Sequence, residues 1–463
     1  MVCCLSLLMV GVDITAVNVA LPAIGAQFDA GVSGLQWTVD AYTVVLASLL
    51  MLGGSLGDRW GRRRVFVTGL IVFSAASVLC AAARTVEMLI AFRALQAVGA
   101  SMLNPVAMSI IANTFTDPRE RAQAVGVWGA MFGVSMALGP IVGGALVSTS
   151  GWPAIFLLNL PIGIAAIVLT LRVIPESRAP HPRRFDPVGQ LLVITLLATL
   201  TFGIIEAPVR GWSSPLIMLV LGAALVAVLG LLAYEPRRRE PLLDLRFFRS
   251  APFSASIVVA VVAFAAFGGF LFVNTLYLQD VRGLSPVQAG LAVLPMAVMT
   301  AVMSPVSGRL VARRGPRAPL VGAGAAMLVA PVLLFGVSAS TSLLQLAAAY
   351  VIFGIGFGLV NAPVTNAAVS GMPRAQAGVA AAVATTSRQV GMTLGVAIVG
   401  AVVTSRLHGS VAAGLGAASA PAWWLIAGWG GAVVVLGLVA TSARAAASAQ
   451  RTAARLNPEA LAA

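Results

Sequence analysis

The chain is built from long apolar runs that are separated by short polar turns. A helix of about 20 apolar residues crosses a bilayer core of about 30 Å, and runs of this length recur throughout the sequence. Because 59% of the residues are hydrophobic and only 10% are charged, an ordinary soluble globular fold is excluded. The sequence predicts an all-α integral membrane protein with fourteen spans, at residues 4–25, 36–57, 65–84, 87–112, 122–146, 154–174, 187–207, 214–234, 252–276, 287–310, 318–337, 343–367, 378–403 and 422–442.

The basic residues support this arrangement because they fall in alternate loops. All 29 are arginines, and 23 of them lie in loops that would share one side of the membrane with both termini. Four lie in loops on the other side, and Arg93 and Arg388 lie within spans. Cytoplasmic loops carry an excess of basic residues, so we expect a multi-pass protein of the cytoplasmic (inner) membrane with both termini in the cytoplasm. The charge of +14 is scattered over loops, which favours a lipid bilayer over nucleic acid as its partner.

A basic turn occurs twice in the chain. Residues 54–64 read GSLGDRWGRRR, and residues 308–317 read GRLVARRGPR. Such internal repeats are common in transporters. We therefore predict two pseudo-symmetric six-helix bundles, 1–175 and 251–442, with two inserted helices in 176–250 and a tail, 443–463, that forms a short cytoplasmic helix or is disordered. In the first copy we single out Gly54, Asp58, Arg59, Gly61, Arg62 and Arg63.

This turn resembles the signature loop between helices 2 and 3 of the major facilitator superfamily, and the whole chain resembles its fourteen-helix drug:proton antiporter branch. The resemblance implies the major facilitator fold, with a loop that latches the two halves together in one state of the transport cycle. Gly139, Pro140, Gly143 and Gly144 resemble the motif that marks antiporters within the superfamily. The alternative for these residues is general helix packing, because small residues let membrane helices approach closely.

Two carboxylates and one arginine are candidates for proton coupling. Asp13 lies in the middle of the first span, where a carboxylate is costly to ionise and is expected to pair with a cation or to exchange a proton. Arg93 and Gln96 resemble the superfamily's helix 4 motif, which is tied to proton coupling. A rise of 1.5 Å per residue puts Asp13 and Arg93 about 6 Å apart along the membrane normal, so they can pair; the alternative is a purely structural pair. Asp40 competes for Arg93, and is either the point where protons arrive from outside or a near-surface charge.

The candidates for a substrate cavity are polar, aromatic and thioether side chains within the spans. Flexible thioethers and aromatic faces suit a cavity that accepts varied apolar molecules, although such stripes are also common in packing and lipid contacts. Glu206, near the end of the seventh span, is expected to be a solvated boundary residue. The cavity candidates are Asn18, Phe267, Asn274, Met296, Met299, Asn361 and Arg388.

The sequence contains no motif for catalysis or for a cofactor. Cys3, Cys4 and Cys80 lack metal-ligand spacing, and a chain without lysine has no Walker loop for nucleotides. We therefore predict a non-enzymatic, monomeric, proton-coupled antiporter that exports small apolar or cationic compounds such as drugs, antibiotics or dyes, driven by the proton gradient alone. The alternatives are a transporter of one specific metabolite and, in another class, a non-transporting receptor or scaffold.

Overall fold

The computed structural model describes residues 2–115, 117–179, 185–238, 241–242, 244–370, 377–407 and 411–456. Within these ranges, every regular element is a helix, and thirteen helices are long and apolar enough to cross a membrane. The long elements are α1 (Val2–Phe28), α2 (Val32–Trp60), α3 (Arg62–Ala81), α4 (Val86–Thr114), α5 (Pro118–Ser150), α6 (Pro153–Leu157) with α7 (Asn159–Val173), α8 (Pro187–Arg210), α9 (Pro215–Tyr234), α10 (Ala251–Leu276), α11 (Pro286–Arg314), α12 (Arg317–Leu333), α13 (Leu343–Val369), α14 (Ala377–Thr404), α15 (Val411–Ala418) with α16 (Ala420–Ala440), and α17 (Ala443–Leu456).

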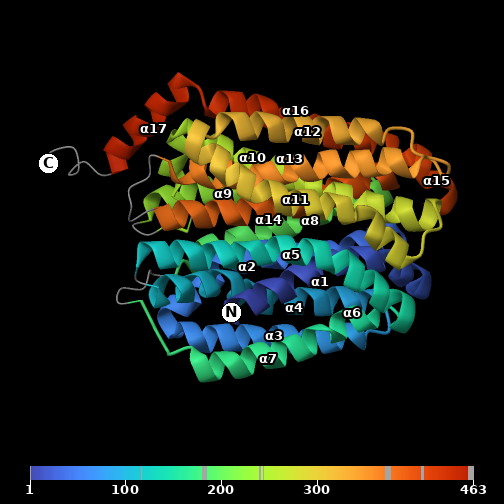
Figure 1. Ribbon diagram of the computed structural model, residues 1–463, viewed down its shortest axis with the longest axis horizontal. Helices are drawn as coiled ribbons and strands as arrows, with labels where there is room; N and C mark the ends of the chain where they lie inside the picture. Colours follow the sequence, from blue (N-terminus) through green and yellow to red (C-terminus); the bar gives the residue numbers. More distant parts are fainter. Residues whose placement is uncertain are drawn as a thin grey trace.

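The helices form two bundles side by side. In Figure 1, α1–α7 occupy one half of the molecule and α10–α16 the other, with α8 and α9 between them in the sequence. All fourteen predicted spans correspond to helices, but α12 has only 17 residues and is shorter than expected. It ends two residues after Pro331, and the chain then turns through Gly336 at a φ of 70°.

The basic turn is closed by one glycine and held by the segment after α7. Gly61, at a φ of 112°, separates α2 from α3, and a Cβ there would meet the carboxylate of Glu176. That carboxylate accepts hydrogen bonds from the backbone N–H groups of Arg63 and Arg64, at the exposed start of α3. Arg62 donates to Asp58 at 3.0 Å. The repeated turn has the same form, since Gly315, at a φ of 76°, ends α11.

The hydrogen bonds between the two bundles lie near one end of the molecule. We call the end with the turn at residues 58–64 the basic end, and the opposite one the far end. Near the far end, the Gln36 amide donates to the carbonyls of Val396 and Ala397 at 3.2 and 2.9 Å, and Gln279 donates to the Val19 carbonyl at 2.8 Å.

Two helices, α5 and α11, show how the separation of the bundles changes along their length. Toward the far end, a Cβ on Gly144 would meet the Pro286 carbonyl of the other bundle at 2.5 Å. Toward the basic end, a Cβ on Gly129 or on Gly308 would meet nothing within 4 Å. Between α5 and α11 the bundles therefore separate toward the basic end, where Thr365 of α13 is exposed. Across the boundary, Met51 of α2 still packs against a cluster of α10, α13 and α14 residues there.

The inserted helix α8 is fastened to α2 at both of its ends. The carboxylate of Glu206 accepts hydrogen bonds from the Trp37 indole at 2.9 Å and the Ser33 hydroxyl at 3.1 Å. At the other end of α8, the Gln190 amide donates to the Ser48 carbonyl at 2.6 Å. The expectation that Glu206 is a solvated boundary residue is wrong, because it is only 9% exposed and joins two helices.

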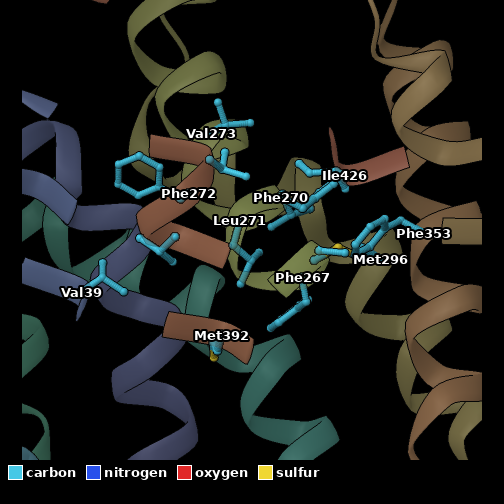
Figure 2. Packing of buried hydrophobic residues seen from close by; sticks show 14 of the residues in the cluster. Val39, Phe267, Phe270, Leu271, Phe272, Val273, Met296, Phe353, Met392 and Ile426 are labelled. Atoms are coloured by element: carbon cyan, nitrogen blue, oxygen red, sulfur yellow. The ribbon is translucent and has the colours of Figure 1, made fainter. Parts of the chain in front are cut away.

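The second bundle has an aromatic core that follows one face of α10. Phe267 stacks on Phe357 with ring centroids 4.1 Å apart, and Phe270 stacks on Phe353 at 4.2 Å. Figure 2 shows these α10 side chains gathered with Met296 of α11. The tail of the chain adds the helix α17, and its Ser448 hydroxyl accepts a hydrogen bond from the Ala251 N–H at the start of α10.

Candidate functional site

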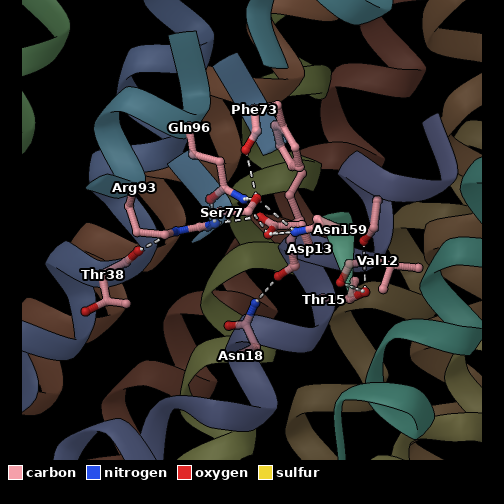
Figure 3. A network of polar contacts seen from close by, with 12 residues as sticks. Val12, Asp13, Thr15, Asn18, Thr38, Phe73, Ser77, Arg93, Gln96 and Asn159 are labelled. Carbon is pink, nitrogen blue, oxygen red and sulfur yellow. Dashed lines mark hydrogen bonds and ion pairs between the residues drawn. The ribbon is translucent and has the colours of Figure 1, made fainter. Parts of the chain in front are cut away.

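The centre of the first bundle holds a buried ion pair. An Nη of Arg93, on α4, lies 2.5 Å from a carboxylate oxygen of Asp13, on α1, and both side chains are 1% exposed. Figure 3 shows the two side chains pointing toward each other between the helices. The pairing that we predicted from their depths is therefore formed, and neither charge reaches lipid or solvent.

The other oxygen of Asp13 is held by two amides. The Gln96 side chain donates to it at 2.8 Å and the Asn159 side chain at 3.0 Å. Both amides also donate to the hydroxyl of Ser77, at 2.8 and 3.3 Å respectively. Charge-assisted hydrogen bonds of this kind are about twice as strong as neutral ones, so four helices, α1, α3, α4 and α7, are tied to one carboxylate.

Arg93 has partners that do not depend on Asp13. Its Nε donates to the Thr38 carbonyl at 3.2 Å, and an Nη donates to the Gln96 side-chain oxygen at 2.6 Å. Its guanidinium carbon lies 4.2 Å from the centre of the Tyr42 ring, within range of a cation–π interaction. The guanidinium would therefore remain bound on three sides if the carboxylate became neutral.

Asp40 does not compete for Arg93. It is fully buried, and one of its oxygens accepts a hydrogen bond from the Thr43 hydroxyl at 3.2 Å, whereas the other has no partner among the residues that the structure describes. Its carboxylate is therefore shielded from solvent in this conformation. Helical periodicity places Asp40 on the face of α2 that carries Gln36 and Val44, and these residues contact α14 of the second bundle. The rise per residue gives the position of a residue along the membrane normal, but not the direction in which its side chain points.

The glycines of the predicted antiporter motif lie where α5 meets its neighbours. A Cβ on Gly139 would overlap the Thr15 hydroxyl of α1, and one on Gly143 would meet the Ala16 Cα at 2.9 Å. A Cβ on Gly144 faces α11 of the other bundle instead. The Pro140 carbonyl occupies the space that a Cβ on Gly290 of α11 would need. These four motif positions let α5 pack tightly on both bundles.

The basic turn was predicted to latch the two halves together, but the contacts described for it lie within its own bundle. Asp58 and Arg62 pair with each other, and the turn bonds to residues 174–179 of its own bundle. Among the described residues, no hydrogen bond or ion pair joins this turn to α10–α17. Arg59 is exposed. A Cβ on Gly54 would lie 3.4 Å from the Cβ of Pro105 on α4. In this conformation the turn does not connect the two halves.

A small enclosed cavity lies between the bundles. Its walls include Thr15 and Asn18 of α1, Pro140 of α5, Phe267 of α10 and Met296 of α11. Three of the predicted cavity residues, Asn18, Phe267 and Met296, are thus brought together. The side-chain oxygen of Asn18 is buried there and finds no hydrogen-bond partner among the described residues.

The other cavity candidates lie elsewhere. Asn274 is buried inside the second bundle, where it accepts a hydrogen bond from the Tyr350 hydroxyl at 2.7 Å, and Met299 is outside the cavity lining. Asn361 and Arg388 are together, on the basic-end side, where an Nη of Arg388 lies 3.4 Å from the Asn361 carbonyl. Sequence reasoning did not identify Ser77 and Asn159 as site residues; their polarity within apolar spans was the available signal.

Comparison with known proteins agrees with this architecture. The sequence model of the Major Facilitator Superfamily matches residues 3–396. The tetracenomycin C resistance and export protein of Streptomyces glaucescens is 37% identical over 404 residues, which cover 86% of this chain and 74% of that protein. The multidrug resistance protein Stp of Mycobacterium tuberculosis is 34% identical over 88% of this chain and 76% of its own length.

A solved structure shares the fold at low sequence identity. The crystal structure of a mutant of the peptide transporter POT, in complex with sulfate, superposes with a TM-score of 0.68 and 17% identity, over 97% of this chain and 94% of that one. No group of three or more His, Cys, Asp or Glu side chains that could hold a metal ion occurs in the part of the chain that the structure describes. The two six-helix bundles, the repeated turn and the family match lead to one conclusion: the chain is a membrane transporter of the major facilitator superfamily.

Proposed function

We propose that the protein is a proton-coupled antiporter that exports small organic compounds, including antibiotics, from the cytoplasm. The observation that carries this proposal is the Asp13–Arg93 pair, a titratable group in a membrane interior, where ionisable residues commonly mark proton pathways. The relatives support the direction of transport, because they are named resistance and export proteins. A transporter of one specific metabolite is the second reading, and these relatives make it the weaker one.

In the proposed mechanism, a proton that reaches Asp13 breaks the ion pair. Arg93 stays bound to the Thr38 carbonyl, Gln96 and Tyr42, so the change falls mainly on α1. Two residues further along, Thr15 lines the cavity and packs against Gly139 of α5. Protonation therefore alters the helix that forms both the cavity wall and the α1–α5 contact, and it favours one state of the transport cycle over the other.

Asp40 is proposed as a second proton-binding carboxylate. It lies on the α2 face that meets α14, and one of its oxygens has no partner within the described ranges. A carboxylate between the bundles can sense their separation, whereas Asp13 lies wholly within one bundle.

The basic turn at residues 54–64 is proposed to form bonds between the two bundles only in the conformation in which the basic end is closed.

The placement in the membrane follows from the arginines. We assign the basic end to the cytoplasm because basic residues are enriched in cytoplasmic loops, and 23 of the 29 arginines would then lie on that side. The conformation is therefore inward-facing, with both termini inside. The functional unit is a monomer with bundles at 1–175 and 251–442, an insertion at 176–250 and a tail from 443, and it needs only the proton gradient.

A vesicle experiment tests the proton coupling. A panel of antibiotics, dyes and aromatic acids is first screened against cells that lack their own pumps, and the compound with the largest change in sensitivity is taken forward. In inside-out vesicles, an acidic lumen should drive that compound inward through the wild-type protein. Asp13→Asn should abolish this accumulation, whereas Asp29→Asn, which changes an exposed carboxylate, should leave it intact.

Normal pH-driven accumulation by Asp13→Asn, at equal amounts of protein in the membrane, would remove Asp13 from the mechanism. If cells with the protein in their membrane are as sensitive to every compound of the panel as cells without it, export itself is contradicted. A receptor or scaffold then becomes the better interpretation. Addition of the compound to the purified protein should release protons if substrate binding is coupled to deprotonation, as in an antiporter. A scaffold should release none.

A further inference from the structure

Arg388 is a membrane-interior arginine without an acidic partner. It lies 11 residues after the start of α14 at Ala377, which is about 16 Å along the helix. Between residues 251 and 442 the sequence contains a single acidic residue, Asp280, and this residue follows α10 at the far end. No ion pair to Arg388 occurs among the described residues. The contrast with Arg93, which is paired at 2.5 Å, makes the free charge specific to the second bundle.

The contacts of Arg388 leave most of its hydrogen-bonding capacity unused. One Nη donates to the Thr365 hydroxyl at 2.5 Å and lies 3.4 Å from the Asn361 carbonyl. The Nε is buried and has no hydrogen-bond partner in the described part of the chain. A guanidinium has five N–H donors in a rigid fork that matches a carboxylate. Both the charge and the donors of Arg388 therefore remain available to a ligand.

The surroundings of Arg388 connect the open basic end with the enclosed cavity. Its partner Thr365 is exposed, and so is Thr385 one turn earlier on α14. On the other side, the Phe264 ring centre lies 6.0 Å from the guanidinium carbon and 5.0 Å from the Phe357 ring. Phe357 in turn stacks on Phe267, which lines the enclosed cavity. A cation beside an exposed threonine thus stands at one end of a chain of contacting aromatic rings, in which Phe264 is 6% exposed and Phe357 is buried.

We infer that Arg388 binds an acidic group of the exported compound. A carboxylate, or a comparable acidic oxygen group, pairs with the guanidinium and accepts a hydrogen bond from the Thr365 hydroxyl, which turns away from the Asn361 carbonyl to donate it. An aromatic or apolar body contacts Phe264. The inference rests on the proposed export function and adds acid-bearing compounds to the apolar and cationic ones expected from the sequence. Pairing an otherwise uncompensated charge in a low-dielectric site strengthens binding, and a cationic group at the same place would be repelled.

Binding measurements with matched ligands test this assignment. The probes are anthracene-9-carboxylate, naphthalene-2-carboxylate and the corresponding neutral carboxamides, titrated into the purified full-length protein in lipid nanodiscs and followed by ligand fluorescence. The wild type should bind each carboxylate at least about tenfold more tightly than its carboxamide. Arg388→Gln should remove this preference while changing carboxamide affinity by less than about twofold, because the aromatic contacts remain.

Three further variants make the test specific. Arg406→Gln removes an exposed charge just after the same helix and should keep the full preference. Arg388→Lys keeps a charge without the fork and should retain a reduced preference. Thr365→Val removes the neighbouring hydroxyl and should weaken carboxylate binding several-fold with little effect on the amides. If Arg388→Gln does not fold, the wild-type preference and the Thr365→Val result decide the question.

The inference is overturned if wild type binds acids and amides equally or binds neither, or if Arg388→Gln keeps the preference. It is also overturned if the preference for acids appears only in Asp40→Asn, since Arg388 would then be neutralised by Asp40 across the α2–α14 contact in the wild type. Because binding is measured without a proton gradient, a failure here is distinguishable from a failure of the vesicle experiment.

Discussion

At the scale of single residues, the polar network around Asp13 contains more than a pair of charges. A buried ion pair repays the cost of removing two charges from water only when further hydrogen bonds complete it. Here the second carboxylate oxygen accepts bonds from Gln96 and Asn159. The amides are therefore positioning residues that hold Asp13 in reach of Arg93.

Replacement of Asn159 by alanine should destabilise the protein. The variant loses a hydrogen bond to a charged, buried oxygen, and such bonds contribute about 1.5–3 kcal/mol. Thermal unfolding of the detergent-solubilised protein, followed by tryptophan fluorescence, should show a lower midpoint for Asn159→Ala. The control Asn366→Ala changes an exposed asparagine and should unfold like wild type. Equal midpoints for the two variants would show that the Asn159 bond contributes nothing.

The sequence predicted the chemistry of this site better than its geometry. The pairing of Asp13 with Arg93 followed from residue depth, because each helix has a fixed rise per residue. The partners Ser77 and Asn159, and the true direction of Asp40, depend on how each helix is rotated about its axis. Nearly uniform apolar spans carry little information about that rotation, since lipid-facing and core-facing residues are alike in polarity.

At the scale of helices, the small residues of α5 decide how closely α1 can approach. We predict that Gly143→Ala lowers stability by about 1–3 kcal/mol, because the new methyl group would meet the Ala16 backbone at 2.9 Å. Gly129→Ala is the matched control on the same helix, because nothing lies within 4 Å of its Cβ position. It should be neutral or stabilising by up to about 1 kcal/mol. The temperature midpoints of the two variants should therefore shift in different directions or by clearly different amounts.

A Gly143→Ala variant that unfolds like Gly129→Ala would mean that α1 and α5 separate at little cost.

Most helices were predictable at this scale, because length and apolarity alone identify a membrane span. The short α12 and the extra helix α15 were not. Their bounds depend on local turn chemistry around Pro331 and Gly336 and on packing beyond the spans, which a hydropathy pattern does not record.

At the scale of the whole molecule, hydrogen bonds between the bundles cluster at the far end. Gln36 and Gln279 donate across the boundary to backbone carbonyls, and each such bond contributes about 0.5–1.5 kcal/mol. These bonds exist only while the far end is closed. They therefore favour the conformation in which the basic end is open.

Replacement of Gln36 by alanine should shift the balance between the two states. A single cysteine at position 365, in a chain whose three native cysteines are replaced by serine, reports the opening at the basic end. Its labelling by a membrane-impermeant maleimide from the basic side should slow several-fold in Gln36→Ala, as a loss of about 1 kcal/mol implies. Gln345→Ala removes a bond inside the second bundle and should not slow it. Unchanged labelling in Gln36→Ala would show that this amide does not hold the far end shut.

The hairpin of α8 and α9 touches both bundles, yet among the described residues its hydrogen bonds to the bundles go to the first bundle alone. Hydrogen bonds join α8 to α2 near both ends, at Glu206 and at Gln190, while toward α14 an apolar cluster contains Leu197 of α8 and packs against Val390. Directional bonds resist sliding and apolar contacts tolerate it. During the conformational change, the hairpin should therefore move as a rigid body with the first bundle and slide over the apolar surface of α14.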